Sequence, residues 1–232
     1  MSIFGFAPRS SGGGADFLPI VKYDARSGLI FRMDAVQTAQ GWDRTPVNIT
    51  AEFKALFDME NMEVGWIDFA TGGAPSFVMV RYPGAQYPAR PNPAHKAGAR
   101  IQIKLAKGCA DGQPAIREMA GNSDRFRDGI EALYASYADQ KMAHPGLLPV
   151  VVMQGATPVT TGGKMTSTNF QPNFVIVDWA PRGDFPAKVF EAPAPQQAVN
   201  GHAQAGPPAT GSQHAAPPQA KAKPVVAADD FG

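Results

Sequence analysis

The composition of the chain changes sharply at residue 191, and this change limits where a fold can form. From Glu191 to Ala228 the sequence is almost entirely Ala, Pro, Gln and Gly, and it contains no aromatic residue. Such a segment cannot bury enough apolar surface to offset the entropy lost on ordering. The whole chain has 232 residues, of which 44% are hydrophobic, which suits one core better than two. We therefore expect one folded domain over residues 1–190 and a disordered tail over residues 191–232.

Apolar and polar residues alternate in eight short runs of the first 190 residues, which is the pattern of half-buried strands. The runs cover residues 17–24, 28–35, 49–57, 62–69, 75–82, 99–106, 148–155 and 173–180. A different pattern follows Ser123, where apolar residues recur at helical spacing and predict one long helix over about residues 123–142. Many short strands with a single helix predict a mainly β fold, either a small β-barrel or a strongly curved sheet.

Several classes of protein are disfavoured by the sequence. It contains no run of eighteen apolar residues, and its first residues, MSIFGFAPRSSGGG, lack the pattern of a secretory signal. The single Cys109 cannot form an internal disulfide or a cysteine cluster for zinc. We expect a soluble, cytoplasmic protein without contact to a membrane.

Charge is distributed unevenly, although the net charge is only +1. No acidic residue occurs between Asp68 and Asp111. The interval contains the cations Arg81, Arg90, Lys96, Arg100, Lys104 and Lys107, together with Tyr82 and Tyr87. In a strand over 99–106, Arg100 and Lys104 share one face. Spaced cations contact phosphates and tyrosine rings stack on unpaired bases, so this interval is a candidate surface for single-stranded nucleic acid. The alternative is an ordinary solvated face.

A second interval without acidic residues runs from Gln140 to Val177. It contains the polar stretch GGKMTSTNFQPN, in which Lys164 and Phe170 are a further cation and a further ring for the same surface.

Residues typical of catalysis do not form a recognisable pattern. His95 and His144 belong to no metal-binding motif, and the stretch TTGGKMTST lacks the glycine and hydroxyl positions of a phosphate loop. The carboxylates Asp58, Glu60 and Glu63 lack the pattern of a calcium loop, so we interpret them as a solvated turn between two strands. We expect no enzyme, no cofactor and no metal.

The chain closes with VVAADDFG, in which Asp229, Asp230 and Phe231 follow the long segment without aromatic residues. A β-rich domain, a linker rich in Pro, Gln, Gly and Ala, and an acidic tip with a phenylalanine together resemble the single-stranded DNA-binding proteins of bacteria and their phages. The predicted helix between the middle and late strands is similar to the helix between the third and fourth strands of an OB-fold. Two features depart from the family: Gly232 follows the phenylalanine, and the tip has only two acidic residues.

The resemblance implies an OB-like β-barrel that covers single-stranded DNA without sequence preference, in the cytoplasm of a bacterial host cell. It also implies that the tip recruits proteins of replication, recombination and repair, and that it occupies the domain's own cationic groove when DNA is absent. The sequence leaves open the number of subunits, a homo-oligomer included. The alternative from another class is a phage structural or assembly protein, in which the β domain contacts proteins and the tail is a tether or a solubilising segment.

Overall fold

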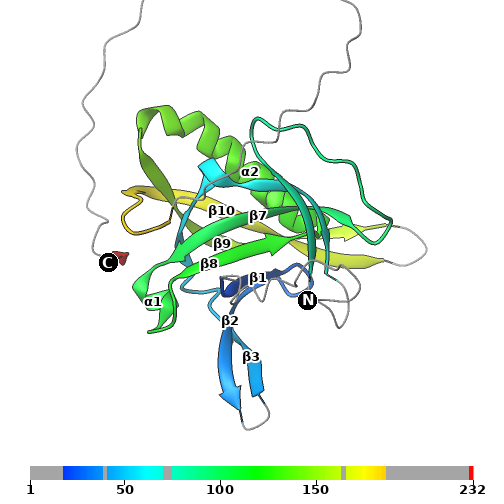
Figure 1. Ribbon diagram of the computed structural model, residues 1–232, viewed down its shortest axis with the longest axis horizontal. Helices are drawn as coiled ribbons and strands as arrows, with labels where there is room; N and C mark the ends of the chain where they lie inside the picture. The colour runs from blue at the N-terminus through cyan, green and yellow to red at the C-terminus, as the bar shows by residue number, and fades with distance from the viewer. Residues whose placement is uncertain (1–17, 39–40, 70–74, 163–165, 187–229, 232) are drawn as a thin grey trace, which may run out of the picture.

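The computed structural model describes residues 18–38, 41–69, 75–162, 166–186 and 230–231 (Figure 1). Within these residues ten strands form one sheet. The strands are β1 (Ile20–Asp24), β2 (Leu29–Thr38), β3 (Gly41–Asn48), β4 (Lys54–Phe57), β5 (Glu63–Asp68), β6 (Ser76–Arg81), β7 (Lys96–Leu105), β8 (Ile116–Gly121), β9 (Leu147–Thr161) and β10 (Ser167–Pro181). The helices are α1 (Lys107–Ala110) and α2 (Asp124–Gln140), with single 3₁₀ turns η1 (Met59–Asn61) and η2 (Lys141–Ala143).

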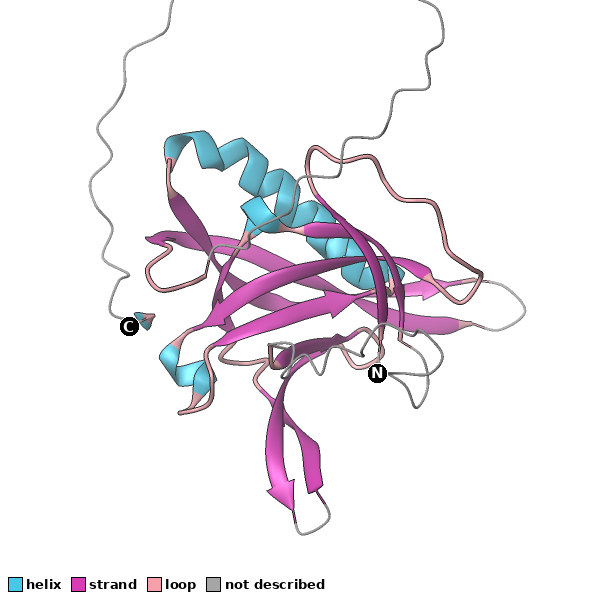
Figure 2. Ribbon diagram, in the orientation of Figure 1, coloured by secondary structure: helices cyan, strands magenta, loops and turns pink. Residues whose placement is uncertain are grey.

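The strands follow the order β10-β9-β4-β7-β8-β1-β2-β3, and β5 pairs with the first half of β7 and carries β6 at its other edge. Among the described strands, the one parallel pair is β1 with β8, and the other pairs are antiparallel. Strands β2 and β3 extend from the body as a hairpin (Figure 2). The prediction of a mainly β fold with one long helix is confirmed.

The predicted barrel is wrong, because the sheet is not closed. Strand β10 meets the turn between β1 and β2 without pairing along either strand. The amide of Phe170 donates to the carbonyl of Ala25 at 2.7 Å, and the hydroxyl of Tyr23 donates to the carbonyl of Phe170 at 2.8 Å. Gly28 allows this approach: its φ is +71°, and a Cβ there would lie 3.0 Å from the Cβ of Phe170.

The long helix begins and ends close to its predicted limits. Ser123 is its N-cap and accepts a hydrogen bond from the amide of Phe126 at 3.3 Å. Phe126, Ile130 and Leu133 are buried on one face of α2, as the helical spacing predicts. The helix packs on β10, where Gly129 lies against Pro172 without room for a Cβ. No helix in the described ranges is long and apolar enough to cross a membrane.

All eight predicted strands are present, but β3 and β8 were not predicted. Strand β3 is polar and contains Pro46, which is tolerated because β3 lies at the end of the sheet. Strand β8 was missed because its inward position 117 is an arginine, which is 1% exposed.

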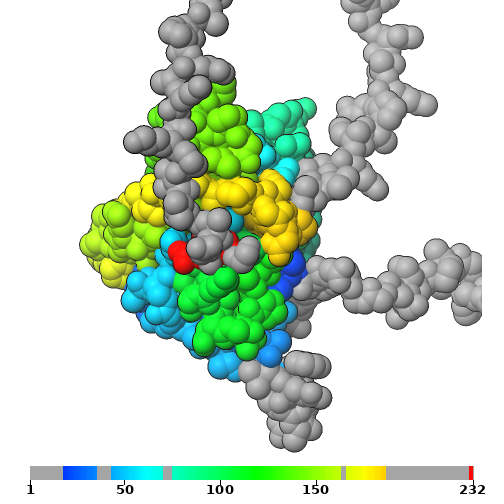
Figure 3. All heavy atoms as spheres, turned by 90° about the vertical axis from the view of Figure 1, so that its left-hand side faces the viewer, coloured from blue at the N-terminus to red at the C-terminus, as the bar shows by residue number. Residues whose placement is uncertain are grey.

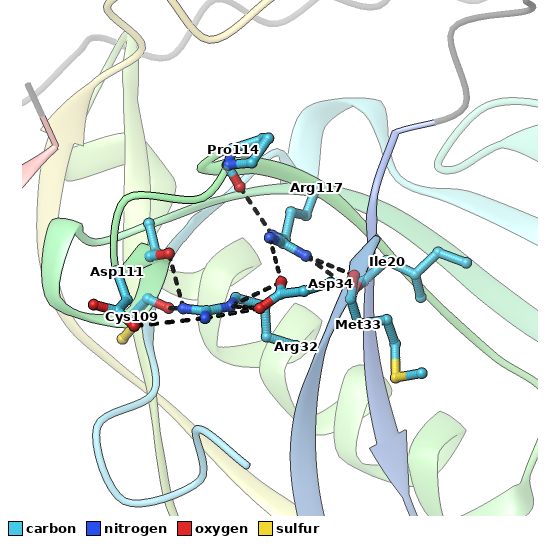
Figure 4. Close-up of polar contacts among 9 residues, drawn as sticks. Ile20, Arg32, Met33, Asp34, Cys109, Asp111, Pro114 and Arg117 are labelled. Carbon is cyan, nitrogen blue, oxygen red and sulfur yellow. Dashed lines mark hydrogen bonds and ion pairs between the residues drawn. The ribbon is translucent and has the colours of Figure 1, made fainter. Parts of the chain in front are cut away.

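Arg117 belongs to a buried charge cluster with Arg32 and Asp34 (Figure 4). Both guanidinium groups contact the carboxylate of Asp34, at 2.9 Å from Arg117 and 2.8 Å from Arg32. Their remaining donors reach backbone carbonyls, for example those of Cys109 and Ala110. The cluster fastens α1 to β2 and occupies the donors of both arginines, so we assign it a structural role.

Candidate nucleic-acid interface

Strand β7 separates the predicted nucleic-acid residues into two regions. Lys96 begins the strand and Lys104 lies near its end, about 25 Å away at the usual rise of a β-strand. Tyr82, Tyr87 and Arg90 lie in the connection that leads to the start of β7, and Lys107 lies in α1 beyond its end. Phe170 lies on β10, half-buried beside Gly28. Lys164 and Asp229 lie outside the described residues.

Arg100 and Lys104, which share a face of β7, are already neutralised by carboxylates. Arg100 pairs with Glu118 at 2.6 Å and lies 3.7 Å from Glu63. Lys104 has a side chain only 7% exposed and bonds to Asp184 at 2.5 Å, and this hydrogen bond lowers the pKa of the Asp184 carboxyl. A phosphate at either cation would have to displace one of these carboxylates.

Arg81 and Arg90 make contacts with the backbone. The Nε of Arg81 donates to the carbonyl of Glu60 at 3.1 Å. Arg90 donates to the carbonyls of His95 and Pro93 at 2.8 and 2.6 Å, and its guanidinium lies 5.3 Å from the centre of the Trp66 ring. Arg90 therefore helps to shape the connection between β6 and β7. Lys96 and Lys107 are exposed.

The two predicted tyrosines line a groove of about 700 Å³ between α2 and the strands β5 and β7. We call it the tyrosine groove and define it by Tyr82, Tyr87, Arg127, Glu131 and Tyr134. Tyr82 and Tyr87 are 40% and 43% exposed, so a ligand can reach both rings. Ala97, Gly98 and Ala99 of β7 also line it, and their small side chains leave space between the rings. Its volume is in the usual range for small-molecule sites.

Contacts within the domain hold these rings in place. The hydroxyl of Tyr87 donates to the carbonyl of Gly65 at 2.6 Å, and its ring meets the Trp66 ring edge-on at 5.6 Å between centroids. Tyr82 meets Tyr134 edge-on at 4.9 Å. Rings fixed before binding lose less entropy when a ligand stacks on them.

Among the described residues that line the tyrosine groove, one is a cation. Arg127 pairs with Asp124 at 2.7 Å, while its Nε is buried and has no hydrogen-bond partner among the described residues. Burial raises the pKa of Tyr87, and the charge of Arg127 opposes that rise. Glu131 lines the same groove with opposite charge. The site therefore offers ring surfaces and one incompletely bonded guanidinium rather than a strongly positive field.

Neither Arg127 nor Tyr134 was predicted from the sequence as a candidate site residue. Their spacing of seven residues places them on one side of α2, beside the stripe that is buried. In the sequence, the position of an arginine and a tyrosine at the margin of the buried stripe was the pattern that could have indicated this site.

The tip of the chain is in contact with the domain. Phe231 is only 6% exposed and lines a small pocket with Leu56, Lys104 and Arg182. Asp230 forms an ion pair with Lys54, whose ammonium lies 6.0 Å from the centre of the Phe231 ring. Phe231 therefore belongs to the buried core, although the sequence places residues 191–232 outside the folded domain. The tip rests between the end of β10 and the region of β7, β8 and α1 (Figure 3).

The predicted solvated turn at Asp58 is also wrong. Asp58 is fully buried and accepts two hydrogen bonds from Arg182, at 2.7 and 2.8 Å. The bond to Asp58 raises the pKa of Arg182 and fixes this side chain at the edge of the Phe231 pocket. Among the described residues no three His, Cys, Asp or Glu side chains are grouped so that they could hold a metal ion.

Comparisons of the chain with protein-family models, with curated proteins and with solved structures find no match.

Proposed function

We propose that this chain binds single-stranded DNA without sequence preference, and that unpaired bases stack in the tyrosine groove. The observation that carries the proposal is the pair of accessible, fixed rings of Tyr82 and Tyr87 above a floor of small residues. Every base has a flat aromatic face, so stacking tolerates any sequence.

Stacking in the tyrosine groove also predicts a preference for single-stranded over duplex DNA. The faces of bases in a duplex are covered by their neighbours, whereas an unpaired base can enter a groove between fixed rings. The buried Nε of Arg127 is a donor without a partner in the described residues, and a phosphate or a base carbonyl would satisfy it. The helix between β8 and β9 also follows the order expected from the resemblance to OB-fold proteins, although the sheet is open.

The proposal assigns the recruitment of replication, recombination or repair proteins to Asp230 and Phe231, and to Asp229 with them. In the structure Phe231 is docked on the domain, so a partner that recognises the ring has to compete with its pocket. We assign no catalytic step to the chain. If the protein is instead an assembly component, the same tip would act as a tether and the tyrosine groove would not bind DNA.

The test is a fluorescence-anisotropy titration with labelled oligo-dT and with a duplex of equal length. We expect tighter binding to oligo-dT and, for Tyr82→Ala or Tyr87→Ala, a loss of about 5- to 150-fold, which corresponds to the usual contribution of one stacked base. Tyr82→Phe keeps the ring and should bind like the unmodified protein. Met142→Ala removes an 83% exposed apolar side chain elsewhere and is the matched control. Equal affinity for the duplex, or unchanged binding by both alanine variants, would refute the proposal.

A further inference from the structure

A second groove, of about 540 Å³, lies beside the start of α2 and contains cations that the sequence did not single out. We call it the basic groove and define it by Lys22, Arg26, Arg44, Phe69, Asn122 and Asn169, all of which line it. These residues come from β1, the turn after it, β3, β10, and the segments that directly follow β5 and β8. Residues so far apart in the sequence form one surface only because the sheet brings them together.

The register of the first three strands places two of the cations on one face. Ile20 lies opposite Met33, and Ala35 lies opposite Arg44. Residues that lie opposite each other on neighbouring strands project to the same side of the sheet, as do alternate residues of one strand. Lys22 is two residues from Ile20 on β1, and Ala35 is two residues from Met33 on β2. Lys22 and Arg44 therefore project from the same side of the sheet. Lys22, Arg26 and Arg44 are all exposed.

The charges of this groove differ from those of β7. Asp24 is the only carboxylate in the described lining, and its oxygens accept bonds from the amide of Arg26 at 3.1 Å and the hydroxyl of Ser27 at 3.0 Å. No side-chain ion pair engages Lys22, Arg26 or Arg44 within the described part of the chain. These three cations are therefore available to an anionic ligand, unlike Arg100 and Lys104.

An exposed ring lies beside these cations. Phe69 is 45% exposed, and its edge contact with Phe77, at 6.1 Å between centroids and 89°, holds the ring while leaving surface open. Cations next to an exposed ring are the combination that contacts phosphates and stacks bases of a single strand. Asn122 and Asn169 add amide groups that form hydrogen bonds with bases or sugars.

Neighbouring residues of α2 line the two grooves. Phe126 lines the basic groove and Arg127 lines the tyrosine groove. We infer that the basic groove is a second contact for the same DNA strand: Lys22, Arg26 and Arg44 bind its phosphates, Phe69 stacks a base, and the strand continues past the start of α2 into the tyrosine groove. This inference rests on the proposed function, which concerns the tyrosine groove alone.

The test compares the full-length protein with Lys22→Ala/Arg44→Ala, using oligo-dT of about 5 nucleotides, near the lower limit of known site sizes, and of about 20 nucleotides, above their upper limit. The control is Lys141→Ala, which removes a charge from an exposed position of η2, outside both grooves. For the long oligonucleotide we expect a loss on the order of 10- to 100-fold at about 50 mM salt, and a log-log salt slope smaller in magnitude by about 1.4. The short oligonucleotide, which the tyrosine groove accommodates alone, should bind both variants equally.

A measurement on the unmodified protein guards against misfolding of the variant. Bound long oligo-dT should protect the Lys22 amine from acetylation several-fold, while Lys141 stays reactive and serves as the internal control. Lys22→Gln/Arg44→Gln, which keeps polar side chains, should repeat the loss seen with alanine. If the protein binds oligo-dT but the basic-groove variant matches the control and Lys22 is not protected, the inference is wrong and the proposed function stands. If the unmodified protein does not bind oligo-dT, both the inference and the proposed function are wrong.

Discussion

Replacing Phe231 by alanine tests whether the tip stays docked in its pocket permanently or exchanges between a docked and a released state. Burial of a phenylalanine ring contributes about 1.5 to 3 kcal/mol. The ion pair of Asp230 with Lys54 has side chains that are 55% and 33% exposed, so it adds at most about 1 kcal/mol. The composition predicts a flexible connection between Pro186 and Asp230, and closing roughly 45 such residues into a loop costs about 3 to 4 kcal/mol. The contacts exceed this cost by no more than about 1 kcal/mol, so we expect docked and released tips to coexist.

Two measurements follow from this balance. Phe231→Ala should lower the thermal midpoint by less than about 3 °C, because docking is favoured by no more than about 1 kcal/mol. Amide resonances of Leu56 and Gly183, which line the Phe231 pocket, should shift between the unmodified protein and the variant. A peptide VVAADDFG added to the Phe231→Ala protein should restore the original shifts with a dissociation constant in the millimolar range or weaker, on the order of 1 mM or above.

The controls separate the ring from the charge. Asp230→Asn keeps the ring and should change the docked population by no more than about fivefold, the equivalent of 1 kcal/mol. A fall in the thermal midpoint of more than about 6 °C in Phe231→Ala would show that the tip belongs permanently to the core. Identical resonances of Leu56 and Gly183 in both proteins would show that the ring does not dock in solution.

Three further predictions concern the grooves and the core. If the tip occupies the DNA site when DNA is absent, as the family resemblance implies, deletion of the tail should raise DNA affinity. Figure 1 instead shows the tip beside α1, at the opposite end of the molecule from the connection between β6 and β7. Deletion of residues 187–232 should therefore change the affinity for short oligo-dT by less than about twofold, and a larger gain would support self-inhibition by the tip. Gly98→Ala should destabilise the domain by about 1 to 3 kcal/mol in urea unfolding, because its Cβ would lie 2.5 Å from the carbonyl oxygen of Gly121; an unchanged midpoint would contradict this packing. Burial raises the pKa of Tyr23 and of Tyr137 to about 12, so their contribution to stability is intact below pH 10 and is lost as the pH rises toward 12. Absorbance at the phenolate band should show two tyrosines that titrate late, and the thermal midpoint should fall over the same pH range. Titration of all five tyrosines together near pH 10 would refute the prediction.

Local signals predicted the parts of the fold that local interactions determine. Ser123 and the apolar spacing behind it predicted α2 to within two residues, because a cap and a buried stripe are both encoded in adjacent positions. The alternation of Ile101 and Ile103 with their polar neighbours predicted the inward face of β7 for the same reason. Strand β8 was missed because its inward Arg117 bonds to the carbonyl of Met33 and the carboxylate of Asp34, both more than 80 residues away in the sequence.

The site was less predictable, since charge counts take no account of partners. Lys104 is 80 residues from Asp184 in sequence, so nothing in the stretch 96–107 indicated that its charge is neutralised. Lys22 and Arg44 lie near acidic residues in the sequence, which hid a surface that the sheet register creates. The tyrosines were found because two of them lie in one short connection, whereas Tyr134 comes from a helix that only the fold brings to them.

The buried cluster of Arg32, Asp34 and Arg117 limits how the sequence of this protein can vary. Replacing one member leaves a charge in a dry interior without its partner, which typically costs about 3 to 5 kcal/mol, whereas exchanging the whole group for apolar residues of similar volume is often neutral. Substitution of one of the three residues is therefore strongly disfavoured, although simultaneous substitution of all three by apolar residues is not. In distant relatives the three positions should be retained together or lost together, which gives a signature for recognising them even where the surface grooves have changed.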